Sequence, residues 1–239
     1  ASKVGNGLVR CLLMCRSFLL YLPTKQVIFT NPIAQNVCVY PDASWSSELA
    51  EGYIGATLVF RGRIFFYSIK LRSRDMLKCF RNINALESLA VIMSLIIFNR
   101  FFAAGDLISI YCDNEAAKFA LLARSAKAVA LNALAFVFNL TVMRRKLLTW
   151  LNRIPSGSNP GDCCTRNDRL TEFKNHFSPT ELFLDEDSYE HMFGILNGDP
   201  VVYGEELATI YFSDTPMEDI VLGNDVVDVP PAKRRRVSI

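Results

Sequence analysis

Four acidic residues stand where a carboxylate could do chemistry: Asp42, Glu87, Asp113 and Asp162. Asp42 and Asp113 each close an apolar run typical of a β-strand, and Glu87 and Asp162 each fall in the first turn of an expected helix. If the two strands are parallel neighbours, they lie about 4.8 Å apart, so their carboxylates repel and call for a positive charge between them. Four oxygen ligands without a histidine suit Mg²⁺ or Mn²⁺.

Each acid also has an ordinary structural explanation. Asp42 could begin a turn, and Asp113 could belong to the cap of the next helix. Glu87 follows Asn84 by three residues, as in a capping box. Asp162 could simply be favoured by a helix dipole. Taken singly these explanations are reasonable, whereas the four acids together favour a site.

Hydrophobic periodicity predicts the elements that must position these acids. The expected strands are 36–42, 52–60, 63–71, 107–113 and 146–155, and the expected helices are 85–103, 114–128, 131–144 and one opened by 158–168. The order is β-β-β-α-β-α-α-β-α. This order predicts an α/β fold with a five-stranded mixed sheet flanked by helices.

Charge is distributed unevenly along the chain. Residues 1–177 contain 22 Lys/Arg and 11 Asp/Glu, a balance of +11, whereas residues 178–228 contain 13 Asp/Glu and no Lys or Arg. A basic body indicates a polyanionic partner, most simply nucleic acid. We expect three parts: an N-terminal segment 1–35, a domain 36–177, and an acidic extension 178–239 that ends in a basic run. The extension could fold back on the body and compete with nucleic acid.

Several classes of protein are disfavoured by composition. Seven cysteines without a CxxC pair fit neither a disulfide framework nor a zinc site, and two histidines disfavour a His-based metal centre or a Ser-His-Asp triad. No convincing secretory signal is present, and the most apolar stretch, 88–99, has the length of a buried helix rather than a membrane span. We expect a nuclear or cytoplasmic protein that is not secreted and has no membrane partner.

The motifs "PDAS", "INALESLAV", "IYCDNEAA" and "LTWLNRIPSGSNPGDCCTR" are similar to those of the ribonuclease H domain that follows reverse transcriptase in LTR-type and DIRS-like retrotransposons. The resemblance covers roughly residues 36–170. The family pattern is a strand-borne Asp, a Glu early in the first helix, a "DN" pair after the fourth strand, and an "N-P-x-D-xx-S/T-R" run that opens the last helix. All four acids are present in that order.

This resemblance implies a ribonuclease H-like fold and a metal site made of Asp42, Glu87, Asp113 and Asp162. It implies two Mg²⁺ ions, with Mn²⁺ as a substitute, and hydrolysis of the RNA strand of an RNA/DNA hybrid to leave 3′-hydroxyl and 5′-phosphate ends. It further implies that the chain is part of a retroelement polyprotein whose reverse transcriptase domain is a partner. Segment 1–35 would then be the end of a preceding polymerase domain.

Two departures from the family pattern keep alternatives open. Pro41 replaces a common Thr, and because proline cannot donate to a sheet ladder, the strand is expected to end or bulge there. The loop "PSGSNP" replaces a mobile histidine, so any role in product release is absent or falls to Ser156 or Ser158. One alternative is a catalytically inactive domain of this fold that binds nucleic acid or has a structural role. Another is an unrelated α/β interaction module whose acids are all caps.

Substrate contacts are expected beside the acids. The candidates are two asparagines that could donate to the minor groove of a hybrid, three cations that could hold phosphates, and one loop serine: Asn84, Asn114, Arg72, Arg74, Lys78 and Ser158. Near the end of the chain, "PAKRRRV" is similar to a nuclear-import signal made of Lys233, Arg234, Arg235 and Arg236.

Overall fold

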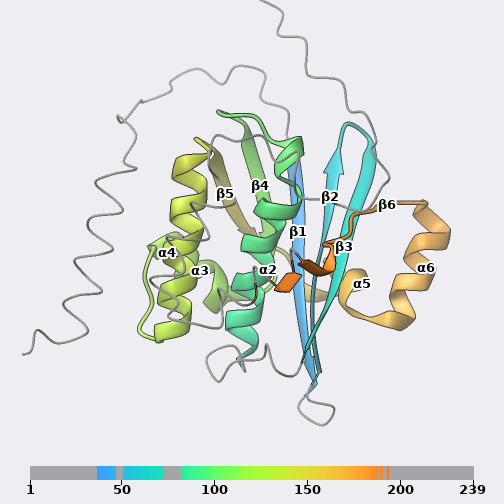
Figure 1. Cartoon of the computed structure of the whole chain (residues 1–239), viewed down its shortest axis with the longest axis horizontal. Coiled ribbons are helices and arrows are strands. Elements are labelled where there is room, and N and C mark those ends of the chain that lie inside the picture. The colour runs from blue at the N-terminus through green and yellow to red at the C-terminus, as the bar shows by residue number, and fades with distance from the viewer. Residues whose placement is uncertain (1–36, 47–50, 73–81, 188, 191–192, 194–239) are drawn as a thin grey trace, which may run out of the picture.

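A computed structural model describes residues 37–46, 51–72, 82–187, 189–190 and 193, which form one sheet with helices around it (Figure 1). The strands are β1 (Val37–Ser46), β2 (Glu51–Phe60), β3 (Arg63–Leu71), β4 (Leu107–Cys112), β5 (Leu148–Arg153) and β6 (Thr180–Glu181). The helices are α2 (Ile83–Ile97), α3 (Glu115–Ala123), α4 (Val129–Arg144), α5 (Asp162–Thr165) and α6 (Asn167–Phe177), with 3-10 turns η1 (Asn99–Phe101) and η2 (Ser156–Ser158).

The sheet has the order β5-β4-β1-β2-β3-β6. β1, β2 and β3 form an antiparallel meander, whereas β4 pairs parallel with β1 and with β5. The predicted α/β class and the element order are confirmed. The sheet has one strand more than expected, because the short β6 pairs parallel with the start of β3.

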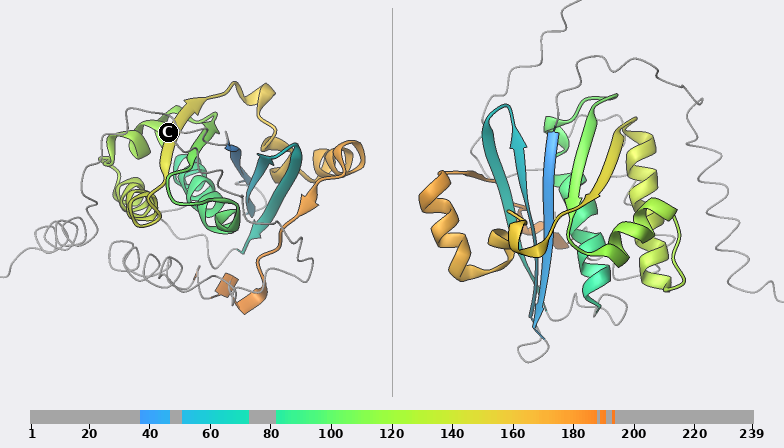
Figure 2. Two further views of the ribbon diagram at one scale, coloured as in Figure 1. Left: turned by 90° about the horizontal axis from the view of Figure 1, so that it is seen from above. Right: turned by 180° about the vertical axis from the view of Figure 1, so that it is seen from behind.

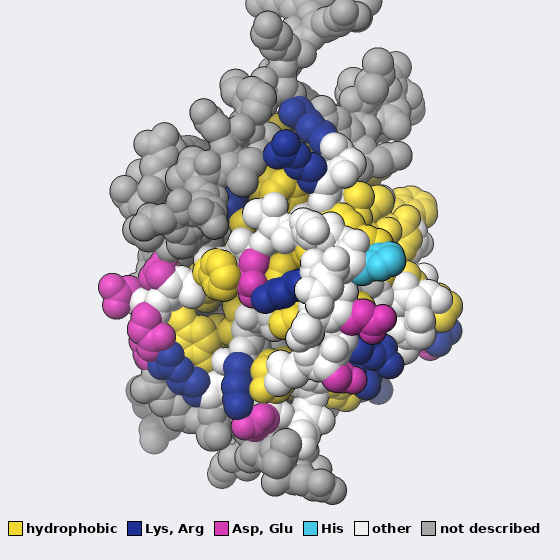
Figure 3. Space-filling model, turned by 90° about the vertical axis from the view of Figure 1, so that its right-hand side faces the viewer, with side chains coloured by type: hydrophobic (Ala, Val, Ile, Leu, Met, Phe, Trp, Pro, Cys, Tyr) yellow, Lys and Arg dark blue, Asp and Glu magenta, His cyan; other side chains and the backbone are white. Residues whose placement is uncertain are grey.

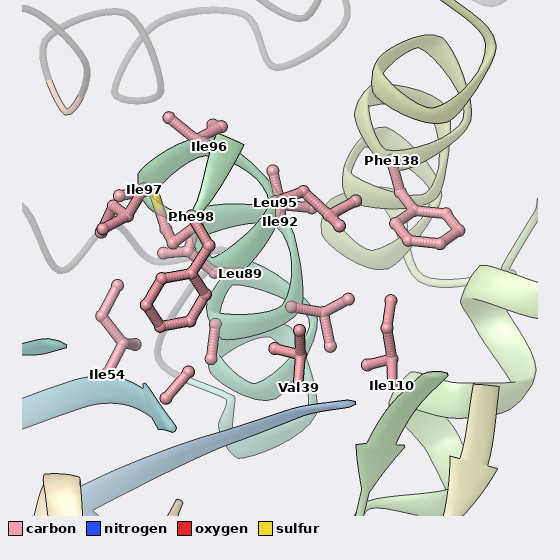
Figure 4. Close-up of a cluster of buried hydrophobic side chains, with 14 of the residues drawn as sticks. Val39, Ile54, Leu89, Ile92, Leu95, Ile96, Ile97, Phe98, Ile110 and Phe138 are labelled. Carbon is pink, nitrogen blue, oxygen red and sulfur yellow. The ribbon is translucent and has the colours of Figure 1, made fainter. Parts of the chain in front are cut away.

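The main core lies between the sheet and α2. Residues 85–97 of α2 are all buried, so this mostly apolar helix is covered around its whole circumference and packs on both the sheet and α4. In Figure 4, Val39 and Ile110 rise from β1 and β4 toward Leu89 and Ile92 of α2, while Phe138 approaches from α4. The predicted buried helix at 85–103 is shorter as an α-helix, because it passes into η1 after Ile97.

The opposite face of the sheet carries α5 and α6. Strand alternation places Tyr40 and its partner Thr57 on this face, and Thr57 contacts Cys164 of α5 at 3.4 Å. A second, smaller cluster of Phe66, Cys164 and Phe173 joins β3, α5 and α6. The view from behind in Figure 2 shows these helices beside β2 and β3, away from α2, α3 and α4.

β1 does not behave as predicted around Pro41. The antiparallel pairing with β2 runs without interruption from Cys38 to Ser46, so the strand neither ends nor bulges at Pro41 on that side. The parallel pairing with β4 stops at Val39, two residues earlier. Proline is therefore tolerated because the β4 side of the strand no longer needs a donor there.

The described part of the acidic extension packs against the domain. Leu182, Tyr189 and Phe193 belong to the main core cluster, and Arg72 forms ion pairs with Glu186 and Glu190. The packed unit thus continues past residue 177, where we expected the domain to end. Segment 1–35 and most of the extension lie outside the described residues.

Within the described residues, the helices are all too short or too polar to cross a membrane.

Candidate metal centre

Asp42 and Asp113 come together at one end of the paired strands β1 and β4. The last parallel pair is Val39 with Ile110, and three further residues along each strand lead to Asp42 and to Asp113. Asp42 and Asp113 each follow a tyrosine by two positions, so each acid lies on the same face of its strand as that tyrosine. The rings of these two tyrosines, Tyr40 and Tyr111, stack with their centroids 5.1 Å apart. The two strands are parallel neighbours, which was the condition for the two carboxylates to meet, but Asp42 lies inside β1 rather than at its end.

Asp42 is buried and receives two hydrogen bonds from neutral side chains. Nδ2 of Asn159 donates to its Oδ1 at 3.3 Å, and Oγ1 of Thr165 donates to its Oδ2. Burial, together with the charges of Asp113 and Asp162, raises the pKa of Asp42 to about 7, although the hydrogen bond from Thr165 lowers it. Among the described residues no Lys or Arg forms an ion pair with Asp42 or Asp113, so the expected bridging cation is not a side chain of that part of the chain.

Glu87 reaches the same place from the second turn of α2. The predicted capping box with Asn84 is wrong, because Asn82 caps the helix and accepts from the backbone N–H of Asn84 at 2.9 Å. Glu87 is only 4% exposed, and burial together with Asp42 and Asp113 raises its pKa to about 9. Its Oε2 is buried without a hydrogen-bond partner. A buried carboxylate oxygen without a donor is costly unless a cation binds it.

Cys112, the residue before Asp113, is the unexpected neighbour of this group. One ligand atom from each of Glu87, Cys112 and Asp113 lies within 4.8 Å of the others. Burial raises the pKa of the Cys112 thiol to about 12, and its Sγ contacts the carbonyl oxygen of Asn114 at 3.6 Å. The thiol therefore stays protonated, and the ligands it leaves for a hard cation are carboxylate oxygens.

Two glycines let α5 lie directly on the sheet beside Asp42. A Cβ on Gly161 would be 2.3 Å from the carbonyl oxygen of Tyr40, and one on Gly55 would be 2.6 Å from Cβ of Cys164. Asn159 precedes this helix, and its Oδ1 accepts from the backbone N–H of Gly161 at 3.0 Å. The N-cap residue of α5 is Gly161 rather than Asn159, so Asn159 acts on the loop before the helix, and its Nδ2 also donates to the carbonyl oxygen of Pro41 at 3.1 Å.

Asp162 begins α5, as predicted, but its carboxylate has partners already. Nε of Arg166 binds Oδ1 at 2.6 Å, and Nη1 of Arg169 binds Oδ2. The side chain of Asp162 is 9% exposed, whereas both arginine side chains are about half exposed. Asp162 is close enough to raise the pKa of both Asp42 and Glu87. It therefore adjoins the other acids while both of its oxygens bind arginine.

The two asparagines proposed to contact substrate are bonded to each other at the rim of this group. Nδ2 of Asn114 donates to Oδ1 of Asn84 at 2.9 Å, and Oδ1 of Asn114 caps α3 by accepting from Ala117 N at 2.9 Å. The amide group of Asn84 keeps its two N–H donors, for which no partner occurs among the described residues. Asn84 is thus the one that can donate outward, and Asn114 holds it in place.

The remaining substrate candidates are scattered. Ser158 is exposed in η2, while Arg74, Lys78 and the run Lys233, Arg234, Arg235 and Arg236 lie outside the described residues. Arg72 lies at the end of β3 with its guanidinium on Glu186 and Glu190, 4.6 Å from the ring of Tyr189. On the side of the molecule shown in Figure 3, Lys and Arg side chains are interspersed with Asp and Glu rather than gathered in one basic field.

Four residues that contact the acids were not predicted as site residues: Asn159, Thr165, Arg166 and Arg169. The run "N-P-x-D-xx-S/T-R" already contains the first three, at 159, 165 and 166. The polar positions of this run other than Asp162 are those that bond to Asp42 and Asp162, so the run carries a signal for these three contacts as well. Arg169 has no comparable signal in the sequence.

A divalent cation fits this group of residues. Three carboxylates converge, two of them with pKa values raised by burial and mutual repulsion, and one buried oxygen has no donor. A hard cation would relieve each of these costs, and carboxylate oxygens are its preferred ligands.

Two ribonuclease H domains are among the solved structures that this chain is similar to. RNase H1 from the halophilic archaeon Halobacterium salinarum NRC-1 is 16% identical, with a TM-score of 0.44 over 57% of this chain and 98% of that chain. The N-terminal RNase H domain of Rv2228c from Mycobacterium tuberculosis is 13% identical, with a TM-score of 0.44 over 59% and 98%. No protein-family model and no curated protein matches the sequence. The ribonuclease H-like fold follows from the strand order, the strand directions and the helices on both faces.

Proposed function

We propose that this chain is a metal-dependent endonuclease that hydrolyses the RNA strand of RNA/DNA hybrids. The observation that supports it best is the convergence of Asp42, Glu87 and Asp113 with an unpartnered oxygen on Glu87. An α/β interaction module whose acids were only caps would have no reason to bury these carboxylates together without cations. Asp162 completes the proposed set of four catalytic and metal-binding residues.

The proposed cofactor is Mg²⁺, as two ions, with Mn²⁺ as a substitute. Bound there, it would offset the repulsion among the carboxylates and supply the Lewis acid for phosphodiester hydrolysis. The chain's own residues orient the ligands: Asn159 and Thr165 bind the two oxygens of Asp42.

Substrate recognition is assigned to the rim of the site. The free N–H donors of Asn84 are placed to bond 2′-hydroxyls in the minor groove of a hybrid, and Asn114 positions them. Arg74, Lys78 and Ser158 remain proposed phosphate or sugar contacts. Arg72 joins them only if phosphate displaces Glu186 and Glu190.

We also propose a retroelement context, in which the reverse transcriptase domain of the same polyprotein is the partner. This proposal rests on the sequence motifs and on the apolar segment 1–35. The run Lys233–Arg236 is a proposed nuclear-import signal. Fusing residues 229–239 to a fluorescent reporter tests it, because import should be lost when these four residues become alanine.

The deciding experiment is cleavage of a hybrid labelled on either strand, with Mg²⁺ or Mn²⁺. Wild type should cut only the RNA strand, and Asp113→Asn should abolish cutting. Asp168→Asn, which changes an exposed acid in the first turn of α6, is the matched control and should cut normally. Absence of cutting, of hybrid binding and of metal-dependent stabilisation would refute the proposal.

A second function is favoured by one observation. Because both oxygens of Asp162 bind arginine, the domain could bind hybrids without cutting them. Hybrid binding in the absence of cleavage, by the whole chain and with either metal, would select this inactive form.

A further inference from the structure

Of the four acids, Asp162 alone has cationic partners within the described part of the chain. Arg166 and Arg169 reach it from the solvent side, and each binds a different carboxylate oxygen. Their side chains are 54% and 50% exposed, whereas that of Asp162 is 9% exposed. We call Arg166 and Arg169 the arginine clamp.

The clamp makes Asp162 different from its neighbours. Asp42 is bound only by the neutral groups of Asn159 and Thr165, and Oε2 of Glu87 has no partner. A cation could therefore bind Asp42, Glu87 and Asp113 without breaking an ion pair. To bind Asp162 as well, it would have to displace a guanidinium from a buried carboxylate.

The clamp also has unused capacity for an anion. A guanidinium has five N–H donors, and each arginine uses one of them on Asp162. The half-exposed guanidiniums present the remaining donors at the edge of the acid group. Such a fork matches the geometry of phosphate as well as that of carboxylate, and the proposed substrate carries one phosphate per nucleotide.

We propose that the arginine clamp is a substrate-phosphate contact that controls whether Asp162 is free to act as a metal ligand. Without nucleic acid, the clamp holds Asp162 and the free protein binds its metal through the other three acids. Phosphates of the bound hybrid draw Arg166 and Arg169 away, and the released carboxylate then completes the site. Hybrid and metal therefore bind with positive coupling, which must be reciprocal. This inference rests on the proposed function.

The first test measures Mg²⁺ binding to the free chain by calorimetry. Asp162→Asn should bind Mg²⁺ as wild type does, because Asp162 is not yet a ligand. The double variant Arg166→Ala/Arg169→Ala should bind Mg²⁺ several-fold more tightly, because Asp162 is released. The matched control is Lys174→Ala, because Lys174 lies in α6 like Arg169 but its ion pair is with Glu181 of β6. This variant should bind Mg²⁺ with the affinity of wild type.

The second test measures coupling directly, by hybrid affinity with and without Ca²⁺, an oxygen-liganded cation. In wild type, Ca²⁺ should tighten hybrid binding at least fivefold, within the usual range of coupling. In Asp162→Asn and in the double variant this gain should shrink to less than twofold. Thermal unfolding checks that each variant is folded. If the double variant does not fold, the milder Asp162→Asn variant still decides the test.

The outcomes separate this inference from the proposed function. If Asp162→Asn weakens Mg²⁺ binding to the free chain while wild type cuts RNA, Asp162 is already a ligand and the clamp hypothesis is wrong. Equal gains from Ca²⁺ in wild type and Asp162→Asn would also overturn it. Absence of RNA cleavage and of Mg²⁺ binding in wild type would instead overturn the proposed function.

Discussion

Asn159 and Asp42, 117 residues apart in the chain, are joined by a hydrogen bond of 3.3 Å from Nδ2 of the amide to Oδ1 of the carboxylate. The same amide donates to the carbonyl oxygen of Pro41 at 3.1 Å, on the side of β1 where pairing with β4 has ended. One side chain thus replaces the missing strand contact and fixes the carboxylate. The backbone of Pro41 and the carboxylate of Asp42 are thus held by the same amide group.

Replacing Asn159 with alanine should therefore damage both stability and the site. It removes the donor to Pro41 and Asp42 and the acceptor for Gly161 N, all buried. We expect a loss of about 1–3 kcal/mol in the free energy of unfolding. Urea unfolding checks it, with the exposed Asn167→Ala as control, and equal midpoints for the two variants would contradict the role assigned to Asn159.

Gly161→Ala should lift α5 from the sheet. The new Cβ would lie 2.3 Å from the carbonyl oxygen of Tyr40. Because this oxygen belongs to the backbone of β1, it cannot move aside without distorting the strand. We expect a loss of about 1–3 kcal/mol, typical of overpacking, together with weaker Mg²⁺-dependent stabilisation. Gly157→Ala is the control, because nothing lies within 4 Å of its Cβ position. If both variants unfold alike, the close approach is not important.

Stability without metal should fall as pH rises. The pKa of Glu87 is raised to about 9 and that of Asp42 to about 7, so the folded state holds protons that the unfolded state has released. The contribution of each protonated carboxyl to the free energy of unfolding is complete below the ordinary pKa of that group. It is lost as pH rises through about 7 for Asp42 and about 9 for Glu87. Urea titrations in EDTA from pH 5 to 9 should show this decline.

Added Mg²⁺ should flatten that profile, because a cation favours the ionised carboxylates. Glu87→Gln should be more stable than wild type at pH 8 in EDTA and should gain less from Mg²⁺. A profile in EDTA that rises with pH would contradict the carboxylate repulsion that we infer.

The acidic extension should compete with nucleic acid through Arg72. Glu186→Gln/Glu190→Gln removes the two carboxylates that bind this guanidinium but leaves the buried Tyr189 and its neighbours in place. We expect several-fold tighter hybrid binding at low salt, measured by fluorescence anisotropy, and little difference at high salt. Glu172→Gln, an exposed acid of α6, is the control. Unchanged affinity at low salt would show that this contact does not compete.

Strand alternation was enough to place Asp42 on the same face of its strand as Tyr40, because side chains alternate along a strand whatever packs around it. The order of strands and helices likewise predicted a mixed sheet with helical cover. Asn84 was predicted to cap α2, but Asn82, two residues earlier, is the N-cap residue. Both asparagines suit a helix start, and only the geometry of the first turn distinguishes them.

The chain alone therefore predicted which acids would form a site, on which elements they lie and what kind of ion would suit them, since these predictions depend on residue type and local periodicity. Which hydrogen bonds and ion pairs each acid makes was decided by contacts between elements that are distant in sequence. Thr165 reaches Asp42 across 123 residues, Arg72 meets Glu190 across 118, and Glu87 is left with an oxygen that no donor reaches. Such contacts follow from how helices and strands pack in three dimensions, and local sequence carries no record of that packing.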